Sequence, residues 1–443
     1  MTKHQNHDLS PMTCPKSLAD VDLFGPGAAE HWCEAYDILH EEAPVLRLPG
    51  EGLTPDRDAF VLTRHADISR VVRDWERFPP TLSLLLDQIR EQGRLPHHMP
   101  DLDAMVISIF SLRPTPQLWR AHRKELTDPW VGPGAGRNRD AIVSHVDSLI
   151  DGWIDTGEVE FVREFARPLP QRMMATILGL PMEDIGQLEI WGNAQVMSYV
   201  HGTGHNNRMT EDQTREKFSL LAGFSDYVRA KVKEKRAKPA DDMISFLTQV
   251  HYEALDRRLT DEEINGIVYA MLIGGLETTQ YAICEQAQLL CENDGLFNRL
   301  KADPSLIRPF IEESMRLRSP TQGLSTRITS QDEEFQGVKV PAGSTLHLRW
   351  GAANVDPEEF EEPYRLDLER KAITRHLAFS AGPRVCPGAG LSRLEQTIAW
   401  ERLVHRLDSL SYAPDNQFMH QPGIMLGTLK LNLHFTRSSE AAQ

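Results

Sequence analysis

The sequence Phe379-Ser-Ala-Gly382-Pro-Arg384-Val-Cys386-Pro-Gly388 decides which fold to expect for this chain. It holds one cysteine between two glycines, just before a helical pattern that runs from Leu391 to Leu407. Glycines allow the backbone to pass close to a flat ligand, and the start of a helix favours a negative charge on sulfur. The stretch predicts that Cys386 is a thiolate ligand. The alternative is a small buried residue, the usual state of a lone intracellular cysteine.

Outward from this stretch, the middle of the chain has apolar residues at helical spacing, at 142–154, 173–180, 218–232 and 264–290. Short segments at 44–49 and 59–63 predict a small sheet, and 335–350 predicts a β-hairpin. Residues 78–116 predict an irregular binding loop. Because no repeat or linker divides the chain, we expect a mainly α fold with small β-sheets (α+β). Residues 1–20 would form a mobile leader, and 21–443 a single domain.

A second motif, Gly274-Gly275-Leu276-Glu277-Thr278-Thr279, lies inside the apolar helical pattern at 264–290. Two glycines would thin the wall of the helix, and a threonine hydroxyl can open the backbone ladder and donate hydrogen bonds. The motif therefore suits a helix that faces a reacting group. The alternative is close packing between helices, which such pairs of small residues more often serve.

Continued through Glu395, the cysteine motif resembles the haem-binding signature of the cytochrome P-450 superfamily, and the chain resembles its soluble bacterial class, such as camphor monooxygenase. The resemblance implies the cytochrome P-450 fold and one haem b (iron protoporphyrin IX), with Cys386 as the ligand to iron. It further implies that the haem loop contains Phe379, Gly382 and Gly388, and that Arg384 pairs with a haem propionate. We expect no other metal.

Three further matches follow the family's order. Glu313 and Arg316 resemble its ExxR pair, which a downstream arginine joins to brace the haem loop. That arginine would be Arg370, although the family spacing falls on Lys371. Trp119 and Arg123, four residues apart on one helix face, resemble the pair that meets a propionate, and Arg327 resembles another propionate arginine. The alternatives are an exposed ion pair, a core tryptophan and a surface arginine.

The resemblance also implies the parts of the active site. Thr278 would be the alcohol and Glu277 the acid that relay protons during oxygen activation. The residues implied around the substrate are Ala270, Ile273, Gly274, Leu324, Ile424 and Met425. Because these side chains are apolar and fairly small, a small to medium hydrophobic substrate is expected. The alternative is that several of them are ordinary core.

Composition limits the partners. A formal net charge of -16 argues against nucleic acid, because phosphate binding depends on Lys and Arg. Five scattered cysteines without a CxxC pair fit a reducing cytoplasm, and no stretch is long enough for a membrane span. By resemblance, Arg77, Arg120 and Lys124 form a basic patch where an acidic two-iron ferredoxin, reduced by its ferredoxin reductase, would dock.

These expectations define an enzyme that splits dioxygen and hydroxylates or O-dealkylates its substrate. Electrons would come from NAD(P)H through the ferredoxin. One alternative within the family uses peroxide, but that normally accompanies a changed acid–alcohol pair. The other alternative is a haem-binding sensor without turnover, which NAD(P)H consumption would distinguish from an enzyme.

Overall fold

Helices make up most of the fold in the computed structural model, which describes residues 14–54, 56–81, 83, 104–200, 209–414, 416–417 and 419–439. The main helices are α1 (Trp32–Glu42), α2 (His65–Arg73), α5 (Pro116–His122), α7 (Arg139–Asp151), α8 (Pro168–Leu178), α9 (Ile185–Val200), α10 (Glu211–Ala237), α12 (Asp261–Gly275), α13 (Thr278–Glu292), α15 (Ile307–Leu317) and α17 (Ala389–Arg406). Shorter ones are α4 (Ala104–Leu112), α6 (Asp128–Val131), α11 (Met243–Gln249), α14 (Leu296–Ala302) and α16 (Trp350–Asn354). The expected α+β class is confirmed.

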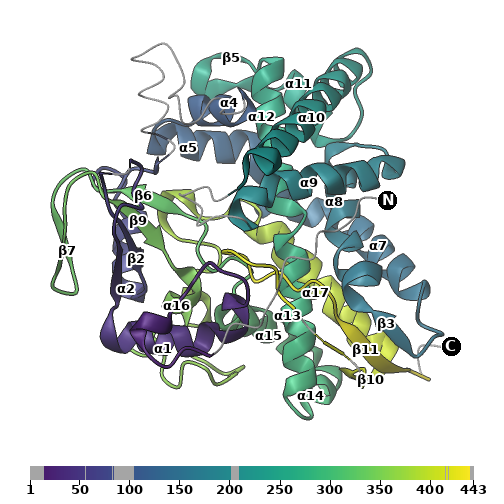
Figure 1. Ribbon diagram of the computed structural model, residues 1–443. Coiled ribbons are helices and arrows are strands. Elements are labelled where there is room, and N and C mark those ends of the chain that lie inside the picture. Colours follow the sequence, from purple (N-terminus) through teal and green to yellow (C-terminus); the bar gives the residue numbers. More distant parts are fainter. Residues whose placement is uncertain are drawn as a thin grey trace.

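Helix α12 begins where the sequence supplies a capping box. The Thr260 side chain accepts a hydrogen bond from the Glu263 backbone, and the Glu263 carboxylate accepts one from the Thr260 backbone. From there α12 and α13 run through the middle of the molecule, with α8, α10 and α17 packed around them (Figure 1). Their apolar faces join one large core, which explains the helical spacing of the apolar residues.

The strands form small sheets beside the helices. Strands β1 (Val45–Leu48), β2 (Ala59–Leu62), β9 (Thr345–Leu348) and β6 (Thr326–Ile328) lie in the order β1-β2-β9-β6, with β2 parallel to β9. A second sheet joins β10 (Leu407–Tyr412), β11 (Asn432–Arg437) and β3 (Glu158–Glu160). Two-stranded pieces are β4 (His251–Tyr252) with β5 (Arg257–Arg258), and β7 (Glu333–Phe335) with β8 (Val338–Val340).

Two local expectations were wrong. The hairpin closes at Gln336 and Gly337, both with positive φ, so β7 pairs with β8, whereas β9 instead pairs with β2 and β6. The segment 78–116 is not irregular throughout, because α4 forms within it and packs against α12 through buried Ile109 and Leu112. The predicted leader lies partly outside the described residues, but Leu18–Asp20 already form a 3-10 turn.

No helix in the described ranges is both long and apolar enough to cross a membrane.

Candidate active site

The cysteine loop is held in one shape by its own backbone and by α2. The Cys386 N–H donates to the Phe379 carbonyl at 2.8 Å, and Gly382–Arg384 form a 3-10 turn. Gly382 has a φ of +69°, and a Cβ there would lie 2.6 Å from the Val72 carbonyl oxygen of α2. Glycine is therefore required at this position. The loop ends where α17 begins, at Ala389.

The Cys386 sulfur is buried, but several neighbouring groups would stabilise a thiolate there. Burial raises the pKa of the thiol, while the backbone N–H groups of Gly388 and Ala389 and the charges of Arg123 and Arg393 act to lower it. Because these donors belong to the start of α17, the helix dipole acts in the same direction. The aromatic ring of Phe379 lies 4.4 Å from the Arg393 guanidinium and closes one side of the loop.

Beside the loop lies a cluster of buried cationic side chains. The Arg384 guanidinium lies 4.3 Å from the Trp119 ring centroid and 4.4 Å from that of Trp75, and the Arg113 guanidinium lies 4.0 Å from Trp119. Arg113 and Arg384 form no ion pair with any described residue, and Nε and Nη2 of Arg384 have no hydrogen-bond partner there. An anion is needed to balance these charges.

Arg327 adds to the same excess of positive charge, and His122 adds two ring nitrogens without a partner in the described part of the chain. Arg327, on β6, donates only to the neighbouring Thr326 carbonyl at 2.9 Å among described groups. Burial, together with the charges of Arg327 and Arg113, lowers the pKa of Arg384 to about 8. Burial also lowers the pKa of Arg113 to about 9 and that of Arg327 to about 10. Two propionate carboxylates would remove this penalty, so the cluster fits haem.

Arg123 differs from this cluster because its side chain has partners within the described chain. Its Nη1 donates to the Val385 carbonyl at 2.9 Å, and its side chain pairs with Asp128 at 3.4 Å. The helix changes from α to π geometry over Arg123–Thr127. Sequence analysis missed His122 and Arg113, because no spacing rule distinguishes them from the other basic residues nearby.

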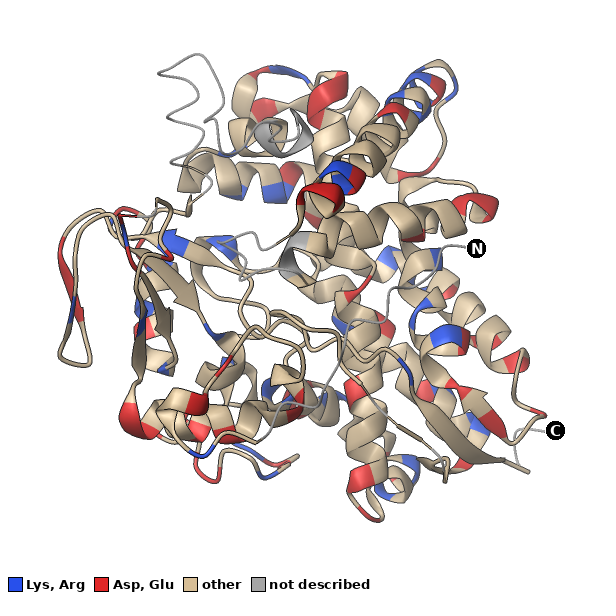
Figure 2. Ribbon diagram, in the orientation of Figure 1, with Lys and Arg blue, Asp and Glu red and all other residues tan. Residues whose placement is uncertain are grey.

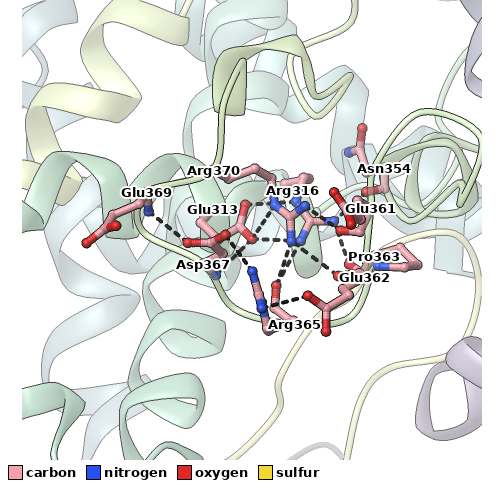
Figure 3. A network of polar contacts seen from close by, with 10 residues as sticks. All are labelled: Glu313, Arg316, Asn354, Glu361, Glu362, Pro363, Arg365, Asp367, Glu369 and Arg370. Carbon is pink, nitrogen blue, oxygen red and sulfur yellow. Dashed lines mark hydrogen bonds and ion pairs between the residues drawn. The ribbon is translucent and has the colours of Figure 1, made fainter.

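The ExxR pair lies fully buried at the centre of a network of polar contacts (Figure 3). Glu313 and Arg316 have side chains with 0% exposure and approach to 2.7 Å, so an exposed ion pair is excluded. Arg316 also donates to the carbonyls of Asn354 and Pro363 at 2.8 and 2.6 Å. Arg370 Nε donates to Glu313 Oε1 at 2.9 Å. The arginine that joins the pair is therefore Arg370, despite the spacing that falls on Lys371.

The central helix is interrupted between α12 and α13, and its two glycines differ. Thr278 Oγ1 donates to the Gly274 carbonyl at 2.8 Å across the break. A Cβ at Gly275 would lie 2.5 Å from the Met174 sulfur of α8, whereas a Cβ at Gly274 would meet no atom within 4 Å. Gly275 therefore serves helix packing, and Gly274 leaves open space beside Thr278. Close packing between helices therefore explains Gly275. The open space at Gly274 is compatible with a helix that faces a reacting group.

Glu277 lies at the same break but is buried. Its Oε2 accepts a hydrogen bond of 2.6 Å from the Tyr281 hydroxyl. Burial raises the pKa of Glu277 to about 7, against the hydrogen bond from Tyr281 and the charge of Arg167. A carboxyl group with this pKa can both hold and release a proton near neutral pH.

The residues expected around the substrate divide into two groups. Ala270 and Ile273 are partly buried on α12, and Leu324 is 38% exposed. By contrast, Ile424 and Met425 have 0% and 3% exposure and lie in a core cluster with Tyr281. Backbone pairing with Thr321 and Gln322 turns them inward. This burial leaves them little surface for a substrate.

The residues expected to dock a redox partner are also divided. Arg77 donates to both carboxylate oxygens of Glu333, at 2.8 and 2.6 Å, and Glu333 also pairs with Arg70. Arg120 and Lys124 are exposed on successive helical turns, and basic residues mark α5 in Figure 2. They form no ion pair within the described ranges. The predicted patch therefore combines two side chains without an ion pair in those ranges with Arg77, which is paired.

This fold, with a cysteine at a helix start beside unbalanced buried cations, defines a haem-binding oxidoreductase. A family model described as cytochrome P-450 matches residues 302–435. The steroid C26-monooxygenase of Mycobacterium tuberculosis is 32% identical over 403 residues, covering 91% of this chain and 92% of the relative. The polyketide biosynthesis cytochrome P-450 PksS of Bacillus subtilis is 28% identical over 400 residues, covering 89% and 94%.

Solved structures agree with these sequence relatives. P-450 BioI, in complex with an acyl carrier protein ligated with hexadec-9Z-enoic acid, superposes with a TM-score of 0.78 at 25% identity, covering 92% of this chain and 99% of that one. The chain belongs to the cytochrome P-450 family. It is accordingly a monooxygenase, an oxidoreductase that incorporates oxygen from dioxygen, and its cofactor is haem b.

Proposed function

We propose that the chain is a haem-thiolate monooxygenase that hydroxylates or O-dealkylates a small to medium hydrophobic substrate, with electrons from NAD(P)H through a two-iron ferredoxin and its reductase. The observation that carries this is the Cys386 thiol at the start of α17 beside buried arginines that lack an anion. Haem, when bound, supplies the centre that activates dioxygen. The five cysteines are all free, which supports a cytoplasmic location.

In this proposal each group of residues has one task. Cys386 holds the iron, with Gly382, Gly388 and Phe379 shaping its loop. The propionates are held by Arg384, Arg327, Arg113, Trp119 and His122. Arg123 fixes the Val385 carbonyl next to the ligand. The buried network of Glu313, Arg316 and Arg370 braces the segment before the loop. Glu277 and Thr278 pass protons toward the space beside Gly274.

The substrate proposal rests on the apolar surface next to the break in the central helix. Ala270, Ile273 and Leu324 offer apolar side chains, and α4 packs against α12 on this side. Named substrates or ligands of the relatives include a steroid and a sixteen-carbon fatty acid, both hydrophobic. These likenesses support a hydrophobic substrate here.

The ferredoxin proposal rests on charge. Arg120 and Lys124 are exposed on one face of the helix that also carries Arg123 to the Cys386 loop. A cationic patch on a chain with a net charge of -16 would direct an acidic partner to this face.

The absorption spectrum of the reduced, carbon monoxide-bound protein tests the thiolate. We expect a strongly red-shifted Soret band that Cys386→Ala removes and Cys291→Ala, at a second partly buried cysteine, retains. A haem-loaded, folded protein without this band would contradict the assignment of Cys386. Substrate-dependent NAD(P)H consumption with a ferredoxin system would then exclude the haem-binding sensor, which has no turnover.

A further inference from the structure

One face of α13, extended by its N-cap residue Glu277, carries acidic and phenolic side chains that the proposed chemistry does not fully use. Glu277, Tyr281 and Glu285 are four residues apart, so they line the same face of the helix. All are buried, with exposures of 8%, 4% and 2%. Buried polar groups need partners. Glu277 accepts from Tyr281, and the chain near its carboxyl end, at residues 420–428, supplies partners for Tyr281 and Glu285.

Tyr281 connects this face to Glu277. Its hydroxyl donates to Glu277 Oε2 at 2.6 Å and accepts from Gln421 Nε2 at 2.9 Å. A phenol has a single proton to donate. Because the Gln421 amide occupies an acceptor position on the oxygen, the tyrosine proton is directed to the Glu277 carboxylate.

Gln421 is itself held by a local turn. Its backbone N–H donates to the Gly427 carbonyl at 2.9 Å, and a Cβ at Gly427 would lie 2.6 Å from Gln421 Nε2. The preceding residue, His420, bridges Glu285 at 3.0 Å and Glu30 at 3.2 Å. The turn is thereby anchored one helical turn beyond Tyr281. The position of the Tyr281 hydroxyl follows from this anchoring.

We propose that Tyr281 is a positioning residue of the oxygen-activation site: its hydroxyl, oriented by Gln421, holds the Glu277 carboxylate at a fixed place and favours its charged form. The proposal rests on the proposed function, in which Glu277 passes protons to Thr278. Thr278 is bonded to the Gly274 carbonyl, and Glu277 to Tyr281.

The other charged groups around Glu277 are Arg167 and Glu189, which come from the start of α8 and from α9. They pair with each other at 3.0 Å and act on the Glu277 pKa in opposite directions. Burial raises the Glu277 pKa and Tyr281 opposes that rise. Loss of the Tyr281 hydroxyl must therefore raise the midpoint of Glu277 protonation.

Infrared difference spectroscopy of the haem-loaded protein tests this, because the Glu277 carboxyl band is identified by its loss in Glu277→Gln. We expect Tyr281→Phe to move the midpoint of that band upward by roughly one pH unit, as for loss of a hydrogen bond to a charged group. Gln421→Leu should move it less, in the same direction. Tyr227→Phe is the matched control, since Tyr227 donates to Asp184 at 2.7 Å away from this face.

An unchanged midpoint in a folded Tyr281→Phe protein would overturn the proposal. If that variant does not fold, Gly427→Ala, which displaces Gln421, supplies the same test, and an unchanged midpoint there would also overturn it. The proposed function is tested separately by the pH profile of NADH oxidation with a surrogate ferredoxin. If Glu277→Gln retains the wild-type pH profile, Glu277 has no role in proton transfer. If the profile changes but Tyr281→Phe leaves the infrared midpoint unchanged, only the positioning role of Tyr281 is contradicted.

Discussion

At the scale of one residue, Arg113 shows how the site differs from an ordinary core. Its guanidinium lies 4.0 Å from the Trp119 centroid, and Arg137 lies at the same distance from Trp130. Arg137 is ion-paired with Asp241 at 2.7 Å, while Arg113 has no ion pair with a described residue. Both arginines therefore contact an aromatic ring, and the feature that distinguishes Arg113 is a charge without an ion-pair partner among the described residues.

We expect Arg113→Leu to weaken haem binding about tenfold or more, because loss of one charge-assisted contact to a propionate costs roughly 1.5–3 kcal/mol. Titration of the apoprotein with haem measures this. Arg137→Leu should retain the wild-type affinity. Equal affinities of the two variants would remove Arg113 from the propionate site.

At the scale of an element, the break between α12 and α13 depends on two adjacent glycines with different surroundings. Gly275 touches Met174 of α8, while Gly274 has open space around its Cα. Met174 is 1% exposed and cannot move away freely. The packing of the central helix against α8 is therefore decided at Gly275.

Gly275→Ala should lower the free energy of unfolding by about 1–3 kcal/mol, the usual cost of overpacking a close contact. Gly274→Ala should leave stability unchanged or raise it by about 0.5–1 kcal/mol, because alanine favours a helix. Urea unfolding of both variants checks the pair. The idea fails if Gly274→Ala proves the more damaging of the two.

At the scale of the whole molecule, His420 joins segments far apart in the chain. Its ring contacts Glu30 near the amino end and Glu285 on the central helix. These carboxylates raise the pKa of His420 to about 9, although burial acts against them. The charged imidazole therefore stabilises the folded state.

The sign of the pH dependence follows from this raised pKa. The contribution of His420 is complete below its unfolded value of 6.5 and is lost as the pH rises toward about 9. The free energy of unfolding of the wild type should therefore fall more steeply between these values than that of His420→Gln. Chemical unfolding of both proteins across this pH range checks the prediction. Parallel curves of unfolding free energy against pH for the wild type and His420→Gln would contradict a charged histidine in the folded protein.

Much of the site could be predicted from the local sequence. Residues close together in the chain determine a ligand-bearing loop, a helix cap and an i, i+3 ion pair. The roles expected for Cys386, Arg384, Glu277 and Thr278 depend on such motifs, and the mainly α class followed from helical spacing. These features depend on interactions within a few turns of the backbone. They needed no knowledge of how distant segments meet.

Tertiary structure alone decided which residues share a buried space. It brought Arg113 and His122 to Arg384, joined Arg370 to Glu313, paired Arg77 with Glu333, and placed Ile424 and Met425 around Tyr281. Desolvation and partners from other elements decide whether the charge of an arginine is paired and whether a substrate can reach a methionine. The spacing of residues along one segment does not contain this information.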